Sequence, residues 1–266
     1  MTQSSSAAAK PGRTGPAAAL PWAIRLGSLA LLLGAWEIYG RAQDNPLSFV
    51  PLSEVIPALV DLVQRQEFWS AYQETLVPFI YGWLLAISIG LVLGLLTGTY
   101  QTISAIFRPY LAFLQALPMS AVIPVVVIAL GIGMTSRVAV VFLFAIADMT
   151  INTASGVRYV DRQLVEMARS FGARERSLFL RVLLPGSTPG VMAGVRIATG
   201  RAVIGMVVVE FLLVSVGLGR LIGRFQGSFQ TAELFATVLA LSCFGVILLE
   251  LVRRFERRLL RWRPER

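Results

Sequence analysis

Long apolar runs alternate with short charged segments along this sequence. Residues 75–107, 109–136 and 234–249 carry no charged side chain. Since about 20 apolar residues cross a bilayer as a helix, each run holds one transmembrane helix. Three further apolar stretches, at 26–36, 138–157 and 191–214, are flanked or interrupted by a few charges. The pattern predicts an all-α polytopic membrane protein with six transmembrane helices, near residues 23–40, 77–98, 110–132, 138–157, 191–214 and 234–252.

Composition supports this reading and removes several classes of function. Apolar residues make up 56% of the 266 residues and charged residues only 15%, with a mean hydropathy of +0.70. A soluble domain carries about 25% charged residues, so an ordinary soluble enzyme is excluded. The sequence has no His and one Cys, which excludes His-based acid–base chemistry and Cys/His metal sites. The net charge of +9 does not indicate nucleic acid, because the basic residues alternate with long uncharged runs.

The basic residues predict the orientation of the helices. With the N-terminus in the cytosol, 17 of the 24 Lys and Arg residues fall in cytosolic segments and 5 in outer segments. This asymmetry favours cytosolic termini in a cell membrane. We expect a disordered tail over 1–21, a membrane domain over 22–252 with an uncleaved first helix, and a basic cytosolic tail over 253–266.

The first outer loop contains apolar residues at helical spacing. Two interpretations remain open for this segment: an interfacial helix on the outer face, or a surface helix that covers the other spans. The residues concerned are Leu52, Val55, Ile56, Leu59, Val60 and Val63.

The cytosolic segment between the fourth and fifth spans, residues 158–189, predicts two short amphipathic helices. Asp161 is placed to cap the first helix, and Gly172 follows it where a helix end favours a positive φ. We expect the second helix to end at Pro185-Gly186. The pattern fits equally well a loop that docks a partner protein and a basic loop that packs on its own bundle or on anionic lipid.

The same segment carries a spaced motif. Glu166-Met167-Ala168, three residues, Gly172, nine residues and then Val182-Leu183-Leu184-Pro185 resemble the EAA loop of ABC importer permeases, with Met and Val replacing Ala and Ile. The flanks resemble the nitrate/sulfonate/taurine-type branch, as in Gly131-Ile132-Gly133 and Gly217-Leu218-Gly219. The resemblance covers about residues 45–263.

The resemblance implies a type I ABC importer fold and a division of labour among subunits. The chain would form a homodimer in the bacterial inner membrane, with two copies of an ATPase and an extracytoplasmic solute-binding protein. It would itself be neither an enzyme nor the holder of a cofactor, since ATP would bind to the ATPase, and its cargo would be a small anion. The residues that would contact the ATPase are Glu166, Met167, Ala168, Phe171, Gly172, Ala173 and Pro185.

Charges within the predicted spans are the candidate path residues, because an unpaired charge at mid-bilayer costs about 2.5–3.5 kcal/mol. Asp148 and Arg201 fall near mid-depth, where they either form a structural pair or line the path. Glu210 lies near the outer end of its span, and snorkelling and path-lining are equally open for it. Kinks at the prolines are compatible with a path or with packing alone. The path set is completed by Asn152, Pro118 and Pro124.

A different class of transporter remains as the alternative. In a proton-coupled secondary carrier, Asp148 and Glu210 would relay protons. Such a carrier gives no purpose to the loop at 158–189, and the halves of the sequence show no clear repeat. An ATP-driven importer is therefore the preferred hypothesis, although no phosphate-binding loop occurs in this sequence.

Overall fold

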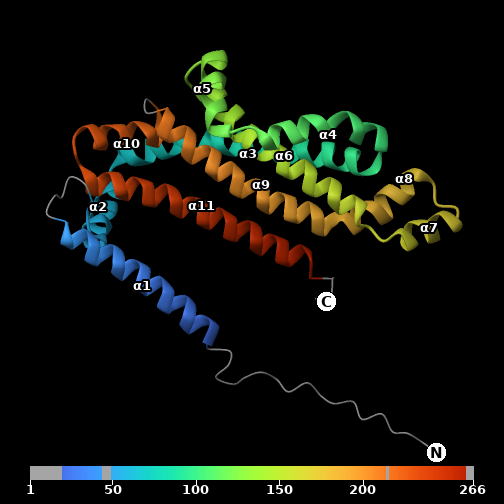
Figure 1. The fold of residues 1–266 in the computed structure, drawn as a ribbon, viewed down its shortest axis with the longest axis horizontal. Coiled ribbons are helices and arrows are strands. Elements are labelled where there is room, and N and C mark those ends of the chain that lie inside the picture. The colour runs from blue at the N-terminus through green and yellow to red at the C-terminus, as the bar shows by residue number, and fades with distance from the viewer. Residues whose placement is uncertain (1–19, 44–48, 214–215, 262–266) are drawn as a thin grey trace, which may run out of the picture.

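The computed structural model describes residues 20–43, 49–213 and 216–261, and within these ranges it contains helices and no strand (Figure 1). The predicted all-α class is confirmed. The predicted tail ends at 1–19 and 262–266 lie outside the described residues. In chain order the helices are α1 Leu20–Ala42, α2 Leu52–Gln64, α3 Gln66–Thr99, α4 Gln101–Ala116, α5 Met119–Leu130, α6 Met134–Arg158, α7 Arg162–Ser170, α8 Glu175–Leu178, the π-helical turn η2 Phe179–Leu183, α9 Leu184–Leu212, α10 Gly217–Gly227 and α11 Thr231–Leu259.

Four helices of the described chain are long and apolar enough to cross a membrane. They are α3, α6, α11 and the continuous helical segment Glu175–Leu212 that ends with α9. The predicted spans 77–98, 138–157 and 234–252 lie in these helices, and so does the part 191–212 of the predicted fifth span. The predicted first span is helical as α1, but it does not belong to this set and remains a prediction as a span.

The predicted span at 110–132 is not one continuous helix. Two helices, α4 and α5, replace it and meet at an angle of 103°, and they count as a fifth span only if the bent pair is taken together. The break falls at Leu117-Pro118, where Leu117 has an extended conformation. A residue before proline disfavours the α region, and proline has no amide hydrogen to donate. In Figure 1, α5 therefore projects from the bundle, whereas α4 runs along it.

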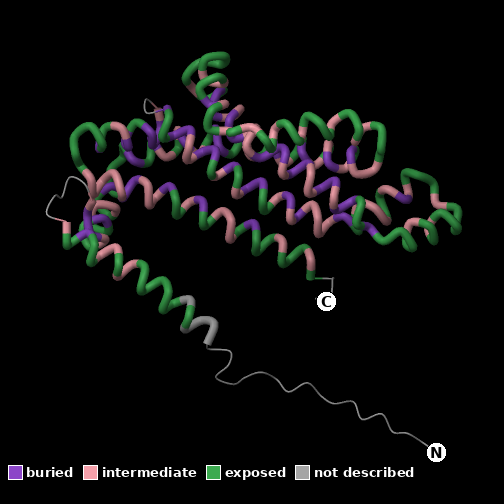
Figure 2. Tube along the Cα trace, viewed as in Figure 1, coloured by how far each residue is buried: buried purple, intermediate pink, exposed green. Residues whose placement is uncertain are grey.

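The core lies where α3, α6 and α9 pack together (Figure 2). Small residues allow this close contact: Gly90 lies against Met149, and Gly94 lies against Thr150 and Thr153. Close backbone approach at small residues is the usual basis of helix packing inside membranes, because lipid removes most of the hydrophobic driving force. The outward faces of α3 and α9 remain apolar and exposed, as at Leu84, Val92 and Ile204.

The two ends of the bundle carry different additions (Figure 1). We call them the α10 end, where α2 and α10 lie, and the α7 end, where α7 and α8 lie. Helix α2 packs on α11 and buries Val55 and Leu62, whereas Ile56 and Val60 are exposed. The structure supports a helix that covers the bundle with one face, and an interfacial position of its other, exposed apolar face stays a prediction.

The predicted end of the second loop helix at Pro185-Gly186 is wrong. The helix continues from α8 through the π turn η2 into α9. Pro185 lies inside this continuous helix, directly after the π turn, where its missing amide hydrogen does not end the helix. The loop is thus connected to α9 by uninterrupted helix, so a displacement of α8 is transmitted directly to the long helix.

Candidate functional site

Helix α7 has the ends that the sequence predicts. The Asp161 carboxylate accepts a hydrogen bond of 2.9 Å from the Gln163 amide, as expected for a helix cap. At the other end Gly172 has φ +76°, the amide of Ala173 donates to Ala168 O, and the amide of Gly172 donates to Arg169 O. This pair of bonds is a Schellman motif, which requires a residue that tolerates a positive φ.

The apolar side chains of α7 are uncovered. Leu164, Met167 and Phe171 are exposed by 48%, 52% and 85%, and no residue of α7 is buried. Ala168 and Ala173 are half-buried, and an added Cβ at Gly172 would meet nothing within 4 Å. A helix with an exposed apolar face on a polar loop is typical of a docking surface. The predicted contact residues except Pro185 therefore lie together on or beside one projecting helix.

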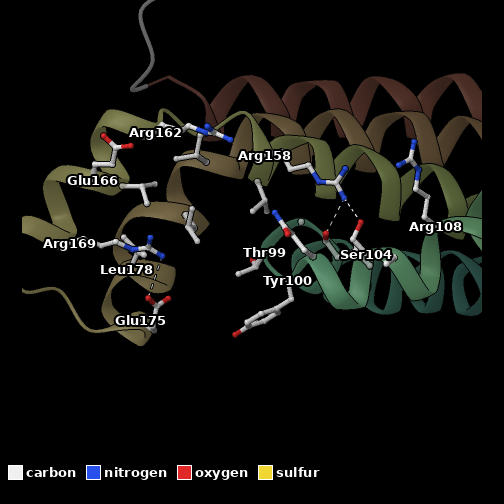
Figure 3. Close-up of a pocket in the computed structure, with 18 residues that line it drawn as sticks. Thr99, Tyr100, Ser104, Arg108, Arg158, Arg162, Glu166, Arg169, Glu175 and Leu178 are labelled. Atoms are coloured by element: carbon white, nitrogen blue, oxygen red, sulfur yellow. Dashed lines mark hydrogen bonds and ion pairs between the residues drawn. The ribbon is translucent and has the colours of Figure 1, made fainter.

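A cleft of about 940 Å³ separates α7 and α8 from the junction of α3 and α4 (Figure 3). The side chain of Arg158, at the end of α6, extends to α3 and α4 in the wall of this cleft. Its Nη2 donates to Ser104 Oγ at 2.7 Å and to the carbonyl oxygen of Thr97 at 3.1 Å. Glu166, a predicted ATPase-contact residue on α7, lines the same cleft and therefore faces the bundle.

The two charges predicted near mid-depth form an ion pair. Arg201 Nε lies 3.2 Å from Asp148 Oδ2, with Asp148 15% and Arg201 57% exposed at the side chain. A small hollow of about 110 Å³ borders the pair, walled by α4, α5 and α6. The pairing prediction is confirmed, and the arginine in addition faces open space. Asn152 donates from Nδ2 to the carbonyl oxygen of Asp148, one turn back in the same helix, at 2.8 Å.

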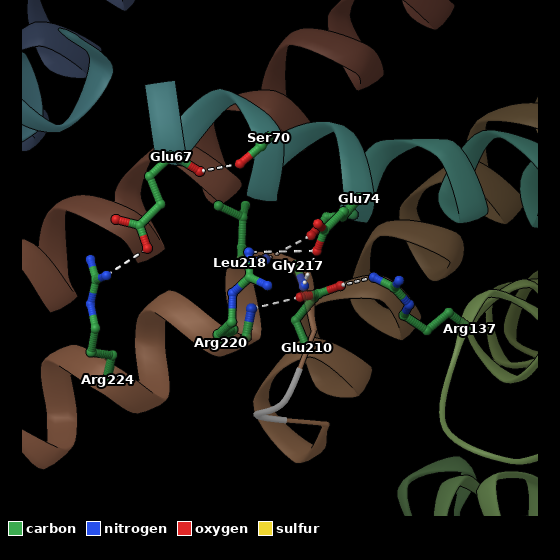
Figure 4. Close-up of polar contacts among 11 residues, drawn as sticks. Glu67, Ser70, Glu74, Arg137, Glu210, Gly217, Leu218, Arg220 and Arg224 are labelled. Atoms are coloured by element: carbon green, nitrogen blue, oxygen red, sulfur yellow. Dashed lines mark hydrogen bonds and ion pairs between the residues drawn. The ribbon is translucent and has the colours of Figure 1, made fainter. Parts of the chain in front are cut away.

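The remaining predicted path residues are not brought to this pair. Pro118 marks the α4–α5 break, beside the hollow, and Pro124 lies within α5. Glu210 is 1% exposed at the α10 end, which contradicts both predicted roles, snorkelling and path-lining. Its carboxylate is fully engaged: Oε1 lies 3.2 Å from Arg137 Nη1, and Oε2 accepts from the Gly219 amide at 2.7 Å (Figure 4).

Glu210 belongs to a cluster that the sequence reasoning missed. The first amides of α10 need acceptors that the helix itself does not supply. The Gly217 amide donates to Glu74 Oε2, and the Leu218 amide donates to Thr75 Oγ1, each at 3.0 Å. Gly217 has φ +63°, and a Cβ there would lie 2.5 Å from Thr75 Oγ1. We call Glu74, Thr75, Arg137, Glu210 and residues 217–219 the α10 clasp. The available signal was Gly217-Leu218-Gly219, read only as a family flank.

Among the described residues, no group of three or more His, Cys, Asp or Glu side chains is arranged to hold a metal ion.

Comparison with known proteins places these features in context. Residues 56–261 match the family model described as "Binding-protein-dependent transport system inner membrane component". The formylaminopyrimidine transport permease protein ThiX of Halalkalibacterium halodurans is 31% identical over 235 residues, which cover 88% of this chain and 94% of that relative. The taurine transport system permease protein TauC of Escherichia coli is 28% identical, over 91% of this chain and 90% of that relative.

The fold also matches a solved structure. An amino acid ABC transporter chain superposes with a TM-score of 0.52 and 15% sequence identity, over 78% of this chain and 96% of that chain. At this identity the likeness concerns the fold alone.

Proposed function

Since the chain belongs to the family of binding-protein-dependent transport system inner membrane components, we propose that it couples to a separate ATPase subunit through residues 158–189. The chain is the permease subunit of an ABC importer for small solutes and not an enzyme. Permeases of this family work with an ATPase and a binding protein. Residues 158–189 would be the part of this chain that contacts the ATPase.

The uncovered apolar face of α7 carries this proposal. Exposed Leu164, Met167 and Phe171 stand on a helix with defined ends, so the surface is preformed and needs little ordering on binding. The helical continuity from α8 through η2 to α9 supplies the mechanical link. ATP-driven movement of the docked ATPase would displace α7 and α8 and, with them, a long helix of the bundle, which is hinge-type alternating access.

The orientation follows from the same proposal. An ATPase that uses cellular ATP lies in the cytosol, so the α7 end faces the cytosol and the α10 end faces outward. The excess of basic residues in the segments at the α7 end supports this orientation. The solute-binding protein then meets the α10 end, and both termini lie on the cytosolic side.

A second copy of the chain completes the path in this account. Helix α5 projects from the bundle with apolar side chains that nothing in the described chain covers: Val125, Ile128 and Leu130 are exposed by 64%, 85% and 49%. A symmetric homodimer that packs on α5 would place the Asp148–Arg201 pair, near the α4–α5 break, close to the dimer axis. Two ATPase copies would then serve two α7 helices.

For the solute we propose a small anion. TauC is named for taurine, which carries a sulfonate, whereas ThiX is named for a pyrimidine, so these two relatives support different classes of solute. Arg201 supports an anion because its side chain is more exposed than that of its partner, Asp148, so the cation of the pair is the more accessible of the two. Specificity would reside largely in the binding protein.

Purification of the tagged chain from native membranes in mild detergent tests the docking surface. The wild-type chain should retain an ATP-hydrolysing subunit, measured as ATPase activity in the eluate. Gly172→Arg should lose it, because a long cation would fill the contact. Two controls should keep it: Gly172→Asn, which is short and tolerates a positive φ, and Gly227→Arg, which adds the same cation to an open position at the α10 end. Full ATPase retention by membrane-inserted Gly172→Arg would refute the assignment.

A further inference from the structure

A polar groove runs from the α7 end along α4 and α6 toward the Asp148–Arg201 pair. The cleft of about 940 Å³ and a second hollow of about 300 Å³ share Thr97, Ser104, Arg108 and Arg158 in their walls. The second hollow shares Gln115 with the hollow of about 110 Å³ at the ion pair. Three adjoining hollows thus connect the loop with the middle of the bundle.

On the bundle side of this groove, Arg108 and Arg158 have no carboxylate partner in the described part of the chain. The other arginines within the long helices α6 and α9 are paired: Arg137 with Glu210, Arg196 with Glu256 and Arg201 with Asp148. Arg158 is instead held by neutral acceptors, through Nη2 alone, so its other N–H donors remain available for a ligand. Arg108 follows Ser104 by one turn of α4, which places its guanidinium in the walls of the same two hollows.

The wall formed by α7 and α8 adds to the positive charge. Arg162 and Arg169 face the cleft together with Glu166 and Glu175, and only Arg169 and Glu175 pair, at 3.4 Å with both side chains largely exposed (Figure 3). The cleft therefore carries four arginines against two carboxylates. Charges of one sign in a recess concentrate the field and raise the local concentration of counter-ions.

We propose that Arg108 and Arg158 form an oxyanion site, which takes a sulfonate, carboxylate or phosphate group at the mouth of the groove. A guanidinium offers paired donors that match two oxygens of such a group, and Arg158 is already oriented by Thr97 and Ser104. The site deepens the proposed function and rests on it, since the anion would be cargo leaving the path beside the coupling helix. Because α7 forms one wall, movement of α7 would change the width of the site. The headgroup of an anionic lipid offers the same chemistry.

Thiol-modification rates in the full-length chain measure the positive charge at this site. Cys243, the single cysteine, is exposed and is replaced by Ser, and Ala105→Cys places a thiol in the cleft wall. The probes are an anionic sulfonatoethyl and a cationic trimethylammonioethyl methanethiosulfonate, applied to the protein in phosphatidylcholine nanodiscs. The ratio of the anionic to the cationic rate should fall about threefold or more at low ionic strength in Arg108→Gln. Arg176→Gln, on α8 but outside the cleft wall, should leave the ratio unchanged.

Competition separates the two sources of the oxyanion. Protection of the thiol by methanesulfonate identifies a free solute, and protection by phosphatidylglycerol in the nanodisc identifies a headgroup. Arg158→Lys should retain charge but weaken the protection, because a lysine does not reproduce the paired donors. An unchanged rate ratio in Arg108→Gln, or no protection by either anion, overturns the site. The assay uses neither ATPase nor transport, so its failure is distinguishable from failure of the docking proposal.

Discussion

A single residue affects the stability of the chain most where its charged side chain is buried away from water. Glu210 and Arg137 are 1% and 7% exposed at the side chain and lie 3.2 Å apart, whereas Glu67 and Arg224, at the same end of the bundle, are each about half exposed. Both pairs join elements that are distant in sequence. Their energetics differ because an exposed pair exchanges water for a partner at little gain, whereas loss of one member of a buried pair leaves an uncompensated charge.

Glu210→Ala should therefore destabilise the chain by about 3–5 kcal/mol, because Arg137 stays buried without its carboxylate and the Gly219 amide loses its acceptor. Glu67→Ala, the matched control, should cost less than about 1 kcal/mol. Thermal unfolding in detergent, monitored by size-exclusion chromatography of heated samples, measures the loss of stability in both variants. Equal losses in the two variants would show that the α10 clasp is not the stabilising feature described here.

At the scale of elements, the sequence was a good guide wherever a local signal decided the structure. The Asp161 cap and the Gly172 helix end depend on neighbouring residues alone, and both were predicted. The effect of proline was harder to predict: a kink was expected at Pro118, where the chain in fact turns by 103°, and Pro185 lies within a helix that it was expected to end. The α10 clasp was missed because Glu74, Arg137 and Glu210 come from three different helices, and no local pattern brings them together.

The contact between α3 and α6 yields a prediction about glycine. A Cβ at Gly94 would lie 2.5 Å from Thr153 Cβ and 2.7 Å from the carbonyl oxygen of Thr150. Gly94→Ala should thus force the helices apart and cost about 1–3 kcal/mol. Gly34→Ala, in α1 with nothing within 4 Å, should cost nothing. The apparent melting temperatures of both variants in the same detergent give the comparison, and a neutral Gly94→Ala would contradict the close packing.

At the scale of the whole molecule, the bundle separates a fixed end from an exposed one. The α10 end is tied by buried charge and by amide contacts to α3, α6 and α9, whereas α7 presents an uncovered helix at the other end. The EAA-type spacing predicted the docking loop at the α7 end, whereas the fixed α10 end was not predicted. The groove along α4 and α6 was not predictable, because it depends on the bend at Pro118 and on how Arg158 crosses to Ser104.

Cross-linking from α7 in native membranes tests whether this helix contacts the ATPase subunit. Met167→Cys in a Cys243→Ser chain carries a short thiol-to-amine cross-linker, and mass spectrometry identifies the products. The account predicts a product with an ATP-hydrolysing subunit, with a yield that changes when ATP is added. Ile128→Cys, at an even more exposed position but on α5, should give no such product. Products from Met167→Cys that contain only the chain itself, with no effect of ATP, would contradict the assignment of α7 as the coupling helix.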